Sequence, residues 1–255
     1  MSHTCRIATL FAALVIAAAV SAGDLVQSNS KRPGLFFAWL SGEPVRVYFP
    51  DRTNLRSLAL HCNSGKDVFS LRTGARAKCK VVVPGSEAAF KDWEEGETTV
   101  QLSTQEPDSP GFGVFSLTPP RTIGWAIRQT TLEEADALKK LLASDKQKFT
   151  ELARELKLDD GIAVGRPGSE SFLVIVPGRV QVEDEFTSYH YHHVFVRRDG
   201  PYSYLGRIDK PYFFVDLDGT DLPAVVTTTD CDGQCIGLVT IAFDAIDGIA
   251  SFSGH

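Results

Sequence analysis

The sequence of 255 residues lacks the short motifs that mark the commonest catalytic sites. It contains no G-x-S-x-G elbow, no H-E-x-x-H zinc motif and no Walker loop, so the signatures of α/β-hydrolases, zincins and P-loop proteins are missing. Basic residues are too few for nucleic-acid binding, because 26 Lys and Arg stand against 32 Asp and Glu. The hydrophobic share of 43% and the charged share of 23% are those of an ordinary globular protein.

Long apolar runs are also absent, except at the N-terminus. Met1–Arg6 is basic, Ile7–Val20 is apolar, and Val20–Ala22 has small residues where a signal peptidase cuts. This pattern predicts a signal peptide over residues 1–22 and export to the periplasm or the outside of the cell. The apolar run is shorter than the roughly 20 residues that a membrane helix needs. An anchor left uncut is the alternative; after removal of the signal we expect no membrane span.

Cysteines are few, and none lies in a C-x-x-C pair. Cys5 precedes the predicted cleavage site, which leaves four: Cys62, Cys79, Cys231 and Cys235. An even number in an exported chain predicts disulfides, and the local pairs Cys62–Cys79 and Cys231–Cys235 are the favoured connectivity. A zinc site is the alternative, but the spacing is not that of paired zinc knuckles.

The remaining chain reads as three blocks. Alternating apolar residues and Gly/Pro turns predict strands over residues 23–128, where Leu58, Leu60 and Cys62 are assigned to one strand. Residues 129–160 predict two amphipathic helices, each opened by a capping box, Thr131 with Glu134 and Ser144 with Gln147. Residues 161–255 are strand-rich again. We expect an α+β fold of mostly antiparallel strands, with a helical insertion between two strand-rich parts that form one unit or two closely packed ones.

Basic residues are missing altogether from the last segment, residues 211–255, which instead contains seven aspartates. Residues 213–225 resemble the acidic calcium loop of FG-GAP or VCBS-type repeats. Asp216 and Asp218 match the first two ligand positions, although Thr220 and Ala224 stand where further acids are expected. The resemblance implies Ca²⁺ held by Asp216, Asp218, Thr220 and Asp221. The alternative is a tight Asp/Gly turn between two strands.

The same D-x-D-G-T string also resembles the first motif of haloacid-dehalogenase-like phosphatases. In that family the residue matching Asp216 is the nucleophile and the residue matching Asp218 is the acid–base, with Mg²⁺ bound. We interpret this as a chance match, because a phosphate site needs positive charge and no Lys or Arg follows Lys210. The Gly-rich segment Gly165–Ser169 is read as an ordinary loop.

Two histidines provide a second metal candidate. On a strand, His190 and His192 share one face with Val194, whereas His193 lies on the other face. An H-x-H pair of this kind binds Zn or Cu when a third ligand joins it. The alternative is a half-exposed aromatic strand with polar histidines.

Together these observations predict an exported, non-enzymatic protein whose role is binding or surface interaction, with a protein or a small ligand as partner. The alternative function is a metal-dependent hydrolase that uses His190, His192 and the Asp-rich loop.

Overall fold

A computed structural model of the chain describes residues 34–40, 45–47, 52–82, 99–103, 111–121, 124–178, 181–182, 188–189, 191–230 and 234–254. The predicted signal peptide lies outside these residues. Within them the protein is β-rich, with antiparallel sheets and few helices, which agrees with the expected α+β class. No helix in the described ranges is both long enough and apolar enough to cross a membrane.

The N-terminal part is a closed antiparallel barrel with the strand order β1-β2-β5-β4-β3-β6. Its strands are β1 (Leu35–Leu40), β2 (Val45–Val47), β3 (Asp67–Ser70), β4 (Arg76–Val82), β5 (Thr99–Ser103) and β6 (Gly111–Ser116). The helix α1 (Arg52–Asn63) joins β2 to β3 and contacts β4. In the part of the chain that the structure describes, each barrel strand pairs with a neighbour on both sides.

The strand predicted at residues 58–62 is wrong, because these residues belong to α1. Leu58 and Cys62 are both buried, whereas Leu60 is 67% exposed. A strand would put Leu60 on the same face as Leu58, but a helix puts residues four apart on one face. The spacing of apolar residues at 58–62 therefore fits both a strand and a helix. The burial of Leu58 and Cys62, but not of Leu60, shows that the helix is correct.

A disulfide between Cys62 and Cys79 fixes the last turn of α1 to β4. The two Cα atoms are 5.1 Å apart, within the usual range for a disulfide. This confirms the predicted Cys62–Cys79 pair. Cys231 lies outside the described residues and Cys235 is described only as a backbone position in a strand, so the second pair stays a prediction.

The C-terminal part begins with a five-stranded antiparallel sheet of order β13-β12-β9-β8-β7. Its strands are β7 (Ala126–Gln129), β8 (Ile162–Gly165), β9 (Phe172–Pro177), β12 (His192–Arg197) and β13 (Tyr202–Ile208); β10 (Gln181–Val182) pairs separately with β11 (Ser188–Tyr189). The helices α2 (Leu132–Ser144) and α3 (Lys146–Glu155), followed by the short 3₁₀ helix Leu158–Asp160, cover one face. Leu138, Leu142 and Phe149 pack there against Val174 and Phe195.

The starts of the two helices test the predicted capping boxes. At α2 the box is confirmed, since Thr131 Oγ1 accepts the backbone N–H of Glu134 and the Glu134 carboxylate accepts that of Thr131. The second box is wrong by one residue. Ser144 is the last residue of α2, and the side chain of Asp145 accepts the backbone N–H of Lys148 instead. Asp, like Ser, caps well, so two adjacent good caps competed for one position.

Glu134 also forms a two-pronged ion pair with Arg128 of β7, with N···O distances of 2.7 and 2.6 Å. The hydrogen bond from Arg128 holds the pKa of the Glu134 carboxyl below its usual range. We expect Glu134→Gln to lower the free energy of unfolding by about 1–2 kcal/mol, because glutamine keeps the cap but loses the charged pair. Urea denaturation measures the loss, with the exposed Glu133→Gln as control; equal stability of the two variants would contradict this role.

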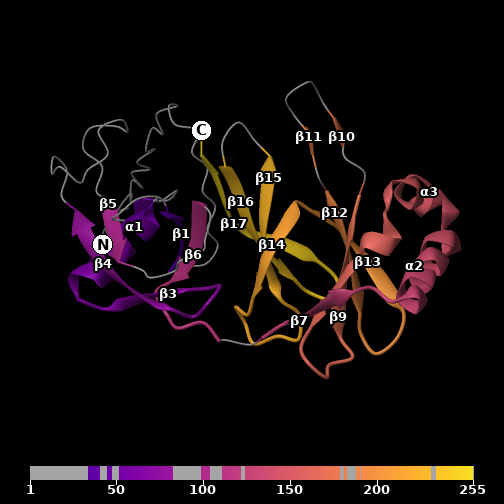
Figure 1. Cartoon of the computed structure of the whole chain (residues 1–255), viewed down its shortest axis with the longest axis horizontal. Coiled ribbons are helices and arrows are strands. Elements are labelled where there is room, and N and C mark those ends of the chain that lie inside the picture. Colours follow the sequence, from indigo (N-terminus) through magenta and orange to yellow (C-terminus); the bar gives the residue numbers. More distant parts are fainter. Residues whose placement is uncertain are drawn as a thin grey trace, which may run out of the picture.

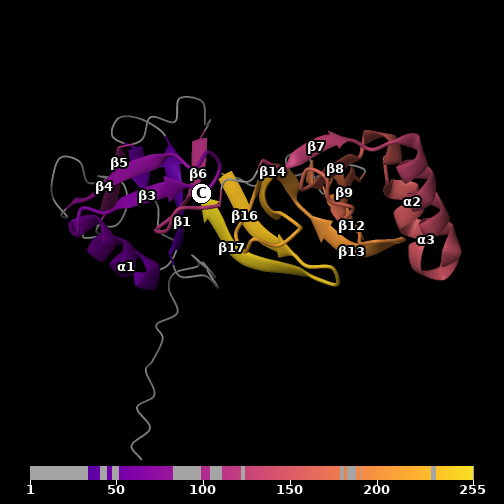
Figure 2. The same ribbon diagram turned by 90° about the horizontal axis from the view of Figure 1, so that it is seen from below.

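A four-stranded antiparallel sheet, in the order β14-β15-β16-β17, forms the middle layer of the molecule (Figure 1). Its strands are β14 (Lys210–Val215), β15 (Ala224–Asp230), β16 (Gln234–Ile241) and β17 (Ile246–Gly254). The barrel lies at one end of the molecule and α2 and α3 lie at the other, as the perpendicular view also shows (Figure 2). The order of layers is therefore barrel, four-stranded sheet, five-stranded sheet and helices.

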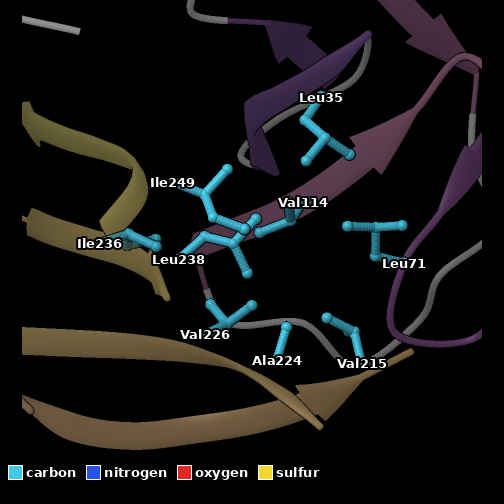
Figure 3. Close-up of a cluster of buried hydrophobic side chains, with 9 residues drawn as sticks. All are labelled: Leu35, Leu71, Val114, Val215, Ala224, Val226, Ile236, Leu238 and Ile249. Atoms are coloured by element: carbon cyan, nitrogen blue, oxygen red, sulfur yellow. The ribbon is translucent and has the colours of Figure 1, made fainter. Parts of the chain in front are cut away.

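Apolar clusters join these layers. One cluster brings Leu35, Leu71 and Val114 of the barrel part against Val226 and Leu238 of the four-stranded sheet (Figure 3). A second joins the two sheets through Leu173, Ile175 and Val194 on one side and Val225 and Ile241 on the other. The four-stranded sheet thus carries one buried cluster shared with the barrel and another shared with the five-stranded sheet.

Candidate functional site

The acidic loop lies between β14 and β15, at the junction of the two sheets. Asp216 follows the buried end of β14 and is itself 5% exposed. Its Oδ1 atom accepts the backbone N–H of Gly219 at 2.6 Å, and Gly219 has a φ of +70°, which suits glycine. The loop is therefore the tight Asp/Gly turn that the sequence analysis held as an alternative, and the side chain of Asp216 closes this turn by accepting the Gly219 N–H.

Arg166 brings positive charge to this loop from the turn between β8 and β9. Its guanidinium donates to Asp216 Oδ2 at 3.2 Å and, through Nε, to the backbone carbonyl of Thr220 at 2.8 Å. Nε also lies 3.7 Å from Asp221 Oδ1. The structure thus gathers Asp216, Thr220 and Asp221 around one guanidinium. A charged hydrogen bond of this kind stabilises a buried carboxylate that would otherwise be costly.

The setting of Arg166 explains how it reaches the loop. Gly165 packs so closely on Phe172 that an added Cβ would lie 2.7 Å from the Phe172 Cβ, and Gly168 has a φ of +78°. The guanidinium lies over the Trp125 ring, with its carbon 5.4 Å from the ring centre, in the range of a cation–π contact. Sequence analysis missed Arg166, because Gly165–Ser169 was read as an ordinary loop. The one available signal was the lack of basic residues after Lys210 beside so many acids, which requires a cation from elsewhere.

Arg121 is a second arginine beside the loop. A Cβ atom at Gly219 would collide with the Arg121 guanidinium, so the two residues are in close contact. Residues 211–255 contain no Lys or Arg, but Arg166 and Arg121 bring positive charge to the loop from earlier in the chain. For the phosphatase resemblance the decisive observation is burial: the Asp216 side chain is 1% exposed and both of its oxygens are hydrogen-bonded, which denies it the access that a nucleophile needs.

The same hydrogen bonds bear on calcium. A Ca²⁺ ion needs six to eight oxygen ligands. Of the predicted set, Asp216 and the Thr220 carbonyl already accept hydrogen bonds from Arg166, and Asp221 faces the same cation. Asp218 is exposed and lies toward the neighbouring pocket. Calcium binding stays a prediction, and this arrangement does not fit it unless the guanidinium moves away.

A pocket of about 230 Å³ adjoins the loop. Its lining combines the loop with the end of β16 and the turn that follows. Apolar side chains dominate this lining, and the polar side chains are Asp218, Thr220 and Thr240. The lining residues are Leu217, Asp218, Thr220, Leu222, Pro223, Ala224, Thr240, Ile241, Ala242 and Phe243. The acidic loop thus forms one wall of an apolar pocket, and Arg166 holds that wall through Asp216 and Thr220.

The histidine pair is only partly described. His190 lies outside the described residues, and His192 is half-buried in β12. His193, which the sequence analysis placed on the opposite face, is the buried one at 6% exposure, with Nδ1 3.0 Å from Tyr204 Oη. Burial, followed by the charges of Arg207 and His192, lowers the pKa of His193 to about 4. The metal pair His190/His192 stays a prediction.

Among the described residues, no group of three or more His, Cys, Asp or Glu side chains is arranged to hold a metal ion. No protein-family model, curated protein or solved structure matches this chain. The function is therefore inferred from the geometry of the pocket and its acidic wall.

Proposed function

We propose that this is an exported binding protein that takes a small, mostly apolar molecule into the pocket beside the acidic loop. The pocket is the observation that carries the proposal. An apolar cavity of about 150 Å³ is enough for benzene. The 230 Å³ available here therefore suits a larger ring or a six-carbon chain.

The lining also restricts the charge of the ligand. Leu217, Leu222 and Phe243 offer apolar contact, while the Asp218 carboxylate stands in the same wall. The Asp218 carboxylate repels a negatively charged ligand, and the resulting loss of binding free energy is greater where apolar walls exclude water. We therefore expect neutral or cationic molecules to bind in preference to anions.

Export is part of this proposal. Its support is the tripartite segment 1–22 and the Cys62–Cys79 disulfide, since such bonds persist in oxidising compartments. We further propose that the parts 23–128, 129–160 and 161–255 act as one unit, because apolar clusters connect the successive layers. A metal-dependent hydrolase remains the alternative function, and metal analysis of the purified protein tests it.

A six-carbon series tests the pocket. We expect 1-hexanol and hexylamine, but not hexanoate, to shift backbone amide signals of Leu217–Phe243 in NMR titrations. Ala242→Phe is expected to weaken binding of both ligands at least tenfold, since it places a ring in the exposed rim of the pocket. Ala143→Phe makes the same change at an exposed position of helix α2, away from the pocket, and is the matched control. Signals that stay unmoved by all three compounds would refute the proposed function.

A further inference from the structure

We propose that Arg166 is the built-in cation of the acidic loop and takes the role that the calcium-loop resemblance assigns to Ca²⁺. The inference goes beyond the proposed function, because it concerns what holds the loop together and not what the pocket binds. It starts from the disagreement between the implied ligand set and the hydrogen bonds that the same residues make.

The charge of the loop favours a cation beside it. The segment 211–255 supplies only aspartates, and Asp216 is buried with its side chain 1% exposed. Burying a carboxylate without a counter-charge is strongly unfavourable, so a cation beside Asp216 stabilises its charged form. Arg166 provides this cation at 3.2 Å, from a turn that is 50 residues away in the sequence.

The contacts of Arg166 match most of the implied calcium ligands. The Arg166 guanidinium donates to the side chain of Asp216 and to the carbonyl of Thr220, and it faces the carboxylate of Asp221. These are three of the four residues that the resemblance assigns to calcium. A planar guanidinium with several donors satisfies a carboxylate and a carbonyl together, as a metal ion satisfies several oxygens.

Other contacts position Arg166. Its guanidinium lies over the Trp125 ring, and its backbone carbonyl accepts the N–H of Ser169 in the turn, so neighbours outside the loop restrict it. A Ca²⁺ ion at these oxygens would have to displace this preorganised group. The wild-type loop is therefore closed to calcium at ordinary concentrations, and removal of Arg166 opens it.

Thermal unfolding with and without about 10 mM CaCl₂ tests this, with NaCl added to match ionic strength. We expect the Tm of the wild type to stay unchanged by calcium. Arg166→Gln should melt several degrees lower and recover part of that loss in CaCl₂. Arg166→Gln with Asp216→Asn should not respond to calcium. Arg154→Gln, an exposed arginine on α3, is the matched control and should behave like the wild type.

Two results would overturn the proposal: a calcium-dependent rise in the wild-type Tm as large as that of Arg166→Gln, or an Arg166→Gln variant as stable as wild type in the absence of calcium. If Arg166→Gln is recovered folded only when it is purified in CaCl₂, the proposal is supported. If it is recovered in neither condition, Arg166→Lys decides. Lysine keeps the charge but lacks the planar fork of donors, so recovery of folded Arg166→Lys with a Tm below that of the wild type supports the counter-ion role. Failure of Arg166→Lys to fold as well refutes it.

Discussion

Replacing Leu238 with alanine is expected to lower the free energy of unfolding by about 3 kcal/mol, within the range of 2–5 kcal/mol for buried leucines. Leu238 is 0% exposed and lies in β16, where it meets the barrel residues Leu35 and Val114 (Figure 3). Alanine removes most of this side chain and leaves a cavity that the two rigid neighbouring layers fill poorly. Chemical denaturation measures the loss.

The matched control is Leu60→Ala on α1. Leu60 is 67% exposed, so the same change in chemistry should alter stability by no more than about 0.5 kcal/mol. A loss at Leu238 that is no larger than the loss at Leu60 would contradict the described packing.

The same variant tests whether the barrel and the sheets act as one unit. Because Leu238 belongs to a cluster shared by both, its loss should raise hydrogen exchange in the barrel strands β1 and β6 as well as in β15 and β16. Faster exchange confined to β15 and β16, with the barrel unchanged, would show that the barrel strands β1–β6 fold separately.

Sequence patterns predicted what depends on neighbours in the chain. The capping box at Thr131 and Glu134 and the apolar stripe of α2 follow from spacing alone, and the structure contains them. In β12, Val194 joins one apolar cluster and Phe195 another, so both faces of the strand are buried, and the half-exposed strand expected as an alternative is wrong. The predicted strand at residues 58–62 failed because a short apolar segment fits either period, and only the tertiary partner of Cys62 decides.

In the candidate site too, the sequence predicted the local feature and missed the tertiary contacts. The turn at Asp216–Gly219 is a local feature, and the sequence analysis had it as an alternative. Its counter-ion was missed because Arg166 comes from another sheet and approaches through space. The pocket was out of reach for the same reason, since its walls come from two segments that meet only in the folded sheet. Arrangements of this kind leave only an indirect trace in the sequence, here the excess of acid after Lys210.

Acid should destabilise the protein through His193. The pKa of this histidine falls from an ordinary value of 6.5 to about 4 in the folded state, mainly because burial disfavours its charged form, with Arg207 and His192 adding to the effect. The unfolded chain therefore binds a proton below pH 6.5 while the folded protein does not. The contribution of neutral His193 to the free energy of unfolding is fully present above pH 6.5, declines as the pH falls, and is lost near pH 4, where the folded state also protonates. We expect the free energy of unfolding to fall by about 2–3 kcal/mol over this range.

Other groups titrate in the same window, so the test compares two proteins. His193→Gln cannot be protonated but keeps a polar group that reaches Tyr204, the hydrogen-bond partner of His193. Denaturation curves recorded from pH 7 to about pH 4 should show the wild type losing about 2–3 kcal/mol more than the variant. The carboxylates, Glu134 among them, affect both proteins alike and cancel in the difference. A buried, neutral histidine binds its proton at a lower pH in the folded protein than in the unfolded chain. Parallel curves of unfolding free energy against pH for the two proteins would therefore show that His193 is not the group that senses acid. An NMR titration midpoint of the His193 ring near 6.5 would show the same.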